Sequence, residues 1–260
     1  MRGRAAIACA FLAHALVPGL ARAQSEKEID HDAQVWVSLN STLRFGDRWG
    51  AIADLHVRRT DFLAEPSFYF ARIGAHRWLT EKLTLTLGYA HMWLPPARDD
   101  WSTWSNENRV YEQLQYSSTL GPLAVLHRVR NEQRWKQQVQ DDELTGESAF
   151  SNRVRYLASF SLPVAKGAHP LALVLSDEIL LQFGHGIVMN TFDQNRLFAG
   201  VKVGLSLAWT FDLGYMQVFQ QKASGYQYDL NHTLRWFIYW APDLRRGRSP
   251  AAHEPGAGDE

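Results

Sequence analysis

Charged side chains at alternate positions are the strongest candidates for chemistry in this 260-residue sequence. Arginine and glutamate recur two residues apart, and a guanidinium pairs with a carboxylate bidentately and tolerates partial desolvation better than an ammonium group does. A spacing of two places such residues on one face of a β-strand. The predicted ion network consists of Glu107, Arg109, Arg128, Arg130, Glu132, Arg134, Arg153, Arg155, Glu178, Arg196 and Arg235.

Two hypotheses account for this set, and the first is favoured. The residues form either a salt-bridged plug that fills a narrow lumen, because small barrels are filled by side chains, or the wall of a narrow pore. Arginine exceeds glutamate in the set, so such a pore would favour small anionic solutes. Both hypotheses use the same residues, and both stay open here.

Serine and histidine are the residues from which a lipid-processing hydrolase of the outer membrane would be built. The candidates are Ser105, Ser151, Ser176, His91, His127 and His232. None of them forms a His-x-Ser element. We therefore predict that the protein is not an enzyme and has no catalytic residue, with an outer-membrane lipid hydrolase as the alternative.

Metal and cofactor sites have little support in the sequence. His185 lies between two glycines without a second ligand nearby, and the acidic pairs at 99–100 and 141–143 lack a calcium-loop spacing. A glycine-rich phosphate-binding loop is also missing. Acidic and basic residues are equal in number at 27 each, which does not favour nucleic acid as a partner. We expect no metal and no cofactor.

The first 23 residues have the features of a secretory signal peptide. Arg2 and Arg4 precede an apolar run, and the small-residue motif Ala21-Arg22-Ala23 follows it, which predicts cleavage after Ala23. The single cysteine, Cys9, lies inside this segment, so the mature chain would carry no thiol. The predicted location is the outer membrane of a Gram-negative bacterium.

The elements that must position the charged residues are strands, because apolar and polar residues alternate with a period of two from residue 33 onward. The predicted strands cover 33–45, 49–60, 67–79, 82–94, 106–119, 122–135, 150–162, 170–183, 193–204, 208–220 and 228–240. Short turns alternate with longer links at 61–66, 95–105, 136–149, 184–192 and 221–227, as in outer-membrane barrels. Because bacterial barrels have even strand numbers, we predict ten to twelve strands and favour twelve.

The composition of the two faces favours a barrel over a secreted soluble β-sandwich that acts as a binding protein. Arginines concentrate on the polar face, whereas Lys82, Lys136, Lys166 and Lys222 lie near turns, which indicates an enclosed polar face. Aromatic residues at strand ends fit two interfacial girdles; they are Tyr89, Trp93, Tyr116, Trp135, Trp236 and Trp240.

The predicted fold is thus all-β, a single antiparallel up-and-down transmembrane barrel over residues 24–241, with a disordered tail at 242–260. Its expected partners are outer-membrane lipid, the barrel-assembly machinery and small anionic solutes, and we expect a monomer. Four polar residues interrupt the apolar face, and a bulge or a position above the membrane would explain each of them. They are Glu112, Asn131, Gln133 and Asp177.

Polar motifs spread over most of the chain resemble those of a bacterial family known as domain of unknown function 2490. The matching segments are Asn106-Glu107-Asn108-Arg109, the run 127–134, Arg153-Val154-Arg155-Tyr156, Asp177-Glu178, the run 192–197, Leu213-Gly214-Tyr215-Met216 and Asn231-His232. The resemblance implies an outer-membrane-type barrel of unknown activity and supplies no catalytic residue.

Overall fold

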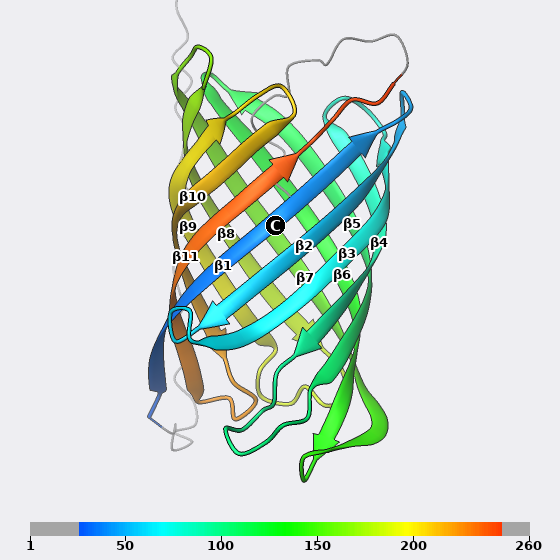
Figure 1. The fold of residues 1–260 in the computed structure, drawn as a ribbon, viewed down its shortest axis with the longest axis vertical. Helices are drawn as coiled ribbons and strands as arrows, with labels where there is room; N and C mark the ends of the chain where they lie inside the picture. Colours follow the sequence, from blue (N-terminus) through cyan, green and yellow to red (C-terminus); the bar gives the residue numbers. More distant parts are fainter. Residues whose placement is uncertain (1–25, 246–260) are drawn as a thin grey trace, which may run out of the picture.

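The computed structural model describes residues 26–245, which form one closed β-barrel of eleven strands (Figure 1). Each predicted strand is present. The strands are β1 (Glu28–Arg44), β2 (Trp49–Thr60), β3 (Glu65–Trp78), β4 (Leu83–Leu94), β5 (Ser105–Leu120), β6 (Leu123–Gln140), β7 (Glu143–Ala165), β8 (Leu171–Phe183), β9 (Phe192–Gly204), β10 (Trp209–Gln221) and β11 (Gln227–Trp240). The all-β prediction is confirmed, whereas the favoured count of twelve strands is wrong.

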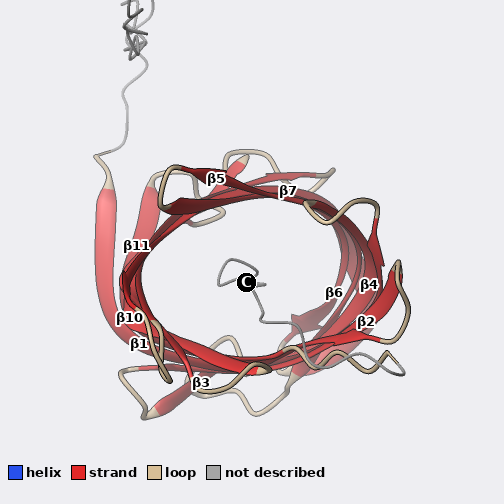
Figure 2. Cartoon of the chain, turned by 90° about the horizontal axis from the view of Figure 1, so that it is seen from above, coloured by secondary structure: helices blue, strands red, loops and turns tan. Residues whose placement is uncertain are grey.

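A parallel pair closes the barrel, which explains the odd strand number. Strand β1 pairs with β11 in the same direction, from Glu28 beside Gln227 to Ser41 beside Trp240, and the other ten pairs are antiparallel. An even number is required only when all neighbours are antiparallel. In Figure 1 the two strands run side by side at the front, and seen from above the closed wall is oval (Figure 2).

The two faces of the wall differ in chemistry as the alternation predicts. Strand β8 alternates strictly between exposed Leu173, Leu175 and Ile179 outside and buried Val174, Ser176 and Glu178 inside. The aromatic residues predicted for the girdles lie on the outer face, where Tyr89, Trp93, Tyr116, Trp135 and Trp236 are exposed by 39 to 45%. Within residues 26–245 there is no helix long and apolar enough to cross a membrane.

The links between strands gather at two rims. The turn rim holds residues 45–48, 79–82, 121–122, 166–170 and 205–208, and the loop rim holds residues 61–64, 95–104, 141–142, 184–191 and 222–226. The predicted long loop at 136–149 is wrong. Strands β6 and β7 continue through it and meet at a two-residue turn, Asp141-Asp142, in which both residues have positive φ. Acidic side chains tolerate this left-handed conformation, which two-residue hairpin turns require.

The tip of the β6–β7 hairpin is joined to the neighbouring loop 95–104. Asp142 accepts backbone hydrogen bonds from Ser102 at 2.9 Å and Thr103 at 2.7 Å. These N–H groups stabilise the carboxylate and lower the pKa of Asp142 below its usual value. The hairpin, which is the longest extension at the lower end of Figure 1, therefore holds one side of the loop rim together.

The four polar residues on the apolar face lie in regular ladders. Strands β5 and β6 pair without a register shift around Glu112, so a bulge is excluded there. Glu112 instead accepts hydrogen bonds from Asn131 at 3.2 Å and Gln133 at 3.1 Å, and Asp177 accepts one from Asn195 at 2.6 Å. The outward carboxylates are thus hydrogen-bonded by amides on the adjacent strand.

Both predicted terminal segments extend beyond the described residues. The signal peptide at 1–23 lies outside them, as does the tail from 246 onward. The first residues of the predicted disordered tail are paired, however: Arg44 donates a backbone hydrogen bond to Pro242 at 3.2 Å and accepts one from Leu244 at 2.7 Å. Residues 242–245 therefore continue along the end of β1.

Glycines facing the lumen make room for aromatic rings that lie flat against the wall. A Cβ added to Gly88 would stand 2.4 Å from the ring of Tyr111, and one added to Gly200 would stand 2.5 Å from the ring of Phe198. Both rings are buried, with exposed fractions of 1% and 0%. The missing side chains thus let large rings fill a narrow lumen, an arrangement that also shields the exposed glycine backbone.

Replacing Gly88 by alanine is expected to destabilise the barrel by about 1 to 3 kcal/mol, because the Tyr111 ring must move out of its packed position. Gly186→Ala is the matched control, since nothing lies within 4 Å of its added Cβ. Urea unfolding in lipid vesicles measures both variants. Equal stability of the two would contradict the packing described for Tyr111.

The contact at Asp142 predicts a pH-dependent rim. Because the pKa of Asp142 is lowered on folding, its contribution is present above the unfolded pKa and is lost as pH falls through the folded pKa. Acidification or Asp142→Asn should therefore speed amide hydrogen exchange at Ser102 and Thr103, after correction for the intrinsic rate. Asp141→Asn, which tolerates the same left-handed backbone, is the control and should leave that exchange unchanged.

Candidate functional site

Glu132 on β6 is a centre of the ion network inside the barrel. Its Oε2 accepts hydrogen bonds from Arg153 Nε at 2.8 Å and Nη2 at 2.6 Å, and its Oε1 accepts one from Arg155 Nη1 at 2.9 Å. Arg109 and Arg130 approach to 3.6 and 3.8 Å. Glu132 lies directly opposite Arg153 in the β6–β7 ladder, a cross-strand position that favours opposite charges. One carboxylate therefore serves four guanidinium groups.

Glu178 on β8 is the second centre and is completely buried, with an exposed fraction of 0%. Arg155 binds it bidentately, with Nε and Nη2 donating at 2.9 and 2.8 Å. Arg128 Nη2 donates at 2.8 Å and Arg196 Nη1 at 3.4 Å. Since Arg155 also binds Glu132, it joins the two centres into a single network across β6, β7, β8 and β9.

The network continues toward the loop rim through Glu107 on β5. Glu107 accepts hydrogen bonds from Arg109 Nε at 2.6 Å and Arg134 Nε at 2.7 Å. Arg130, besides its approach to Glu132, donates a hydrogen bond to the neutral amide of Gln113 at 2.8 Å. The structure thus brings together ten of the eleven predicted network residues.

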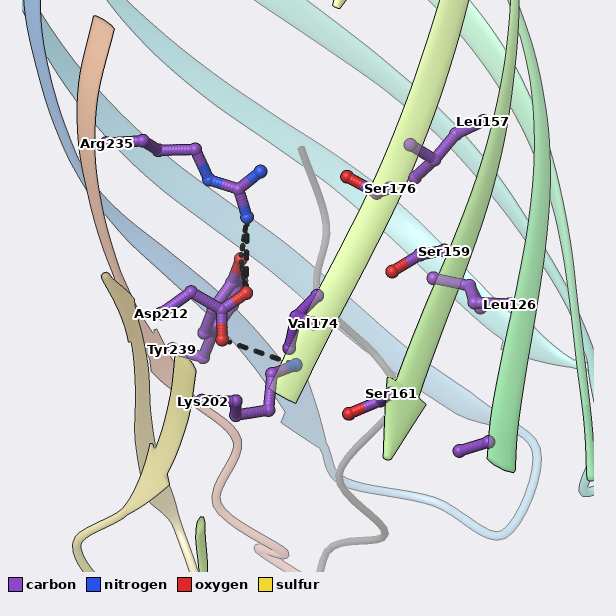
Figure 3. A pocket seen from close by; sticks show the side chains of 11 residues that line it. Leu126, Leu157, Ser159, Ser161, Val174, Ser176, Lys202, Asp212, Arg235 and Tyr239 are labelled. Carbon is purple, nitrogen blue, oxygen red and sulfur yellow. Dashed lines mark hydrogen bonds and ion pairs between the residues drawn. The ribbon is translucent and has the colours of Figure 1, made fainter. Parts of the chain in front are cut away.

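The eleventh residue, Arg235, lies in a second cluster nearer the turn rim (Figure 3). Asp212 is the centre of this cluster, with Arg235 Nη2 and Tyr239 Oη each at 3.2 Å and Lys202 Nζ at 3.6 Å. The cluster borders a cavity of about 20 Å³, room for about one water molecule. Lys202 lies near a turn, as predicted for lysines, but its side chain is buried inside the barrel.

Apolar side chains fill the part of the lumen that faces the network. Strands β1, β8, β9, β10 and β11 supply a cluster in which Phe198 and Met216 have exposed fractions of 0% and 1%. On the network side, Arg128 and Arg130 are equally buried, at 1% and 2%. We refer to these buried ionic and apolar side chains together as the floor.

Between this floor and the loop rim lies a chamber of about 280 Å³. Lys136 and Gln220, which are near the loop-rim ends of β6 and β10, mark its outer part, and Arg155 marks its deep end. Nine cationic side chains and three carboxylates line the chamber. Asp54 and Glu178 are not in the lining but pair with lining arginines. When these two carboxylates are added to the three, the nine cations still exceed the carboxylates by four. The arrangement favours negatively charged ligands.

Several lining or neighbouring charges were missing from the predicted set. Arg72 pairs with Asp54, whose Oδ2 accepts from Arg72 Nε at 2.5 Å, and Asp193 accepts from Arg153 Nη1 at 3.0 Å. Arg58 on β2 also faces the chamber. Arg58 and Asp54 share the polar side of the predicted strand 49–60, so the alternation itself was the signal for including them. Arg72 and Asp193 required knowledge of which strands are neighbours.

The serine and histidine candidates are separated by the wall. His91, His127 and His232 hydrogen-bond outward-facing groups, Asn108 at 2.8 Å, Tyr156 at 2.9 Å and Tyr215 at 2.7 Å. Ser105 and Ser176 are buried on the inner side of the barrel. Ser151 lies on the same face of β7 as Arg153, which also points inward. In the described part of the chain, no group of three or more His, Cys, Asp or Glu residues is arranged to hold a metal ion.

Removing one centre of the network is expected to destabilise the barrel strongly. Glu132→Gln leaves four arginines around a neutral amide, and breaking a buried ion pair in this way costs about 3 to 5 kcal/mol. Glu81→Gln is the control, because its carboxylate is 84% exposed and its contact with Arg44 is worth at most about 1 kcal/mol. Urea unfolding in vesicles compares them. A loss below about 1 kcal/mol for Glu132→Gln would contradict the central role of this carboxylate.

Comparison with known proteins identifies the family alone. No curated protein and no solved structure matches the chain. The model of one family, described as protein of unknown function (DUF2490), matches residues 33–229, which run from within β1 to the beginning of β11 and include the ten connected residues of the ion network but not Arg235. The chain therefore belongs to the DUF2490 family, as the polar motifs in its strands indicated.

Proposed function

We propose that this protein is an outer-membrane β-barrel that does not conduct ions and binds small anionic solutes in a chamber open to the loop rim. The ion network acts as the plug that forms the chamber floor. The arginines and glutamates thus close the lumen, as in the plug hypothesis. The excess of arginine attracts anions, as in the pore hypothesis, but the anions bind and do not pass through.

The chemistry of the wall supports the membrane location. A soluble barrel would expose polar side chains outside and bury apolar ones, whereas here leucine and aromatic residues lie outside and arginine and glutamate lie inside. Lipid-embedded barrels have this inverted pattern, with aromatic girdles near both interfaces. The same proposal includes export by the predicted signal peptide with cleavage after Ala23. It also includes insertion by the barrel-assembly machinery and a monomeric state.

The observation that carries the proposed activity is the contrast between the floor and the chamber. Glu178 and Phe198 at the floor have exposed fractions of 0%, which leaves no room there for a hydrated ion. Immediately beside the floor, the chamber retains about 280 Å³ and an excess of positive charge. A cationic pocket with a closed floor suits binding better than permeation. The alternative of a lipid hydrolase gains no support, because the three histidines face outward whereas Ser105 and Ser176 are buried on the inner side and form no Ser–His pair with them.

Two measurements on the purified protein test the proposal. In planar bilayers the protein should show no ohmic conductance, whereas steady anion-selective currents would favour the pore. In calorimetry at low salt, methyl phosphate should bind to the protein in zwitterionic nanodiscs, and the affinity should fall as salt rises. Lys222→Gln, which changes a cation at the loop rim outside the chamber lining, should bind as the unchanged protein does. Absence of binding would refute the chamber as an anion site.

A further inference from the structure

One arginine of the chamber, Arg58, differs from the other arginines of the lining in having no acidic partner among residues 26–245. It is 94% buried, with an exposed fraction of 6%. Its Nε has no hydrogen-bond partner, and among residues 26–245 no carboxylate forms an ion pair with its guanidinium. Arg109, Arg134 and Arg153 in the same chamber each bind a carboxylate. A buried charge without a partner is costly, which indicates that a ligand supplies the missing negative charge.

Aromatic rings hold the Arg58 guanidinium in place. Its Cζ lies 3.4 Å from the centre of the Trp36 ring and 4.6 Å from that of Phe68. Trp36 also carries the guanidinium of Arg196, whose Cζ is 5.1 Å from the same ring. Cation–π contacts of this kind orient a guanidinium but do not neutralise it. Two arginines held on one tryptophan ring therefore form a preorganised site for an anionic headgroup.

The chamber wall on β3 and β4 is largely apolar, and its one cation, Arg72, is paired with Asp54. Phe68 and Phe70 are half-buried, as is Leu94 at the end of β4, and Met92 lies opposite Phe70 in the β3–β4 ladder. Apolar surface inside a charged chamber gains free energy only when an apolar group covers it. A simple inorganic anion would leave this wall exposed to water.

We infer that the ligand is an amphipathic anion, a phosphate monoester or carboxylate on a short alkyl chain. Its headgroup binds Arg58 and Arg196 beside Trp36, and its chain lies along Phe68, Phe70 and Leu94. A guanidinium fork matches both phosphate and carboxylate oxygens, so the two headgroups share this recognition. The inference rests on the anion-binding chamber proposed above and adds the class of ligand.

Calorimetry with methyl phosphate, hexyl phosphate and hexanoate, on the full protein in zwitterionic nanodiscs, tests the inference. Each methylene buried against the apolar wall adds up to roughly fourfold in affinity, so hexyl phosphate should bind at least about tenfold more tightly than methyl phosphate. Empty nanodiscs correct for partition into lipid. The affinities of hexanoate and hexyl phosphate are compared to show whether the site prefers a carboxylate or a phosphate headgroup.

Three variants assign the two ends of the ligand. Arg58→Gln should weaken both phosphates at least about tenfold, and Arg58→Lys, which keeps the charge without the fork, should give an intermediate affinity and covers the case in which Arg58→Gln does not fold. Leu94→Ser should reduce the gain from the hexyl chain and therefore weaken hexyl phosphate more than methyl phosphate. Heat-modifiable mobility in detergent gels confirms that each variant is folded.

The possible outcomes separate this inference from the proposed function. If methyl phosphate and hexyl phosphate bind equally, the chamber is an anion site but the inferred amphipathic ligand is wrong. Binding that survives Arg58→Gln unchanged would also overturn the inference, because the headgroup would then lie elsewhere. If none of the three probes binds, both the chamber function and the ligand class fail.

Discussion

The structure depends on the sharing of a few buried carboxylates among many arginines. Glu132 and Glu178 lie inside the barrel with exposed fractions of 3% and 0%, and Arg155 binds both. An isolated charge at such a position would cost several kcal/mol, so the network is stable only when every member is bridged to its neighbours. Because its residues come from the five adjacent strands β5 to β9, the network also fixes the register of that wall. Charge pairing inside the barrel thus takes the place that apolar packing has in a soluble domain.

The other wall complements this network. Small residues such as Gly200 let the Phe198 ring lie flat, and the apolar cluster around it meets the ionic half at the floor. The floor divides the lumen into a chamber of about 280 Å³ and a cavity of about 20 Å³ beside Asp212. The large chamber keeps an excess of cations, whereas the floor pairs its charges tightly. The same set of side chains thus supplies both the cationic lining of the chamber and the buried residues of the floor.

Local alternation was enough to predict all eleven strands and most of the ion network, because the facing of a side chain on a strand depends only on its parity. The strand count failed at twelve, since the parallel β1–β11 pair is a long-range contact with no local signal. The sequence predicts a loop where the hairpin at 141–142 forms, because the residues around it are exposed on both faces beyond the barrel and do not alternate. Arg235 was grouped with the network by parity, but its height in the barrel places it beside Asp212. Parity identifies the inner face, and only the register shows which inner residues meet.

Thiol labelling tests most directly whether the lumen is a chamber with a closed floor. With Cys9 replaced by serine, Ser67→Cys lies in the chamber lining and Thr233→Cys lies at the floor, where the native threonine has an exposed fraction of 0%. A membrane-impermeant thiol reagent should modify Ser67→Cys rapidly and leave Thr233→Cys unmodified in the folded barrel, with both reacting after unfolding. Equal rates of modification in the folded barrel would contradict a closed floor and would favour an open pore.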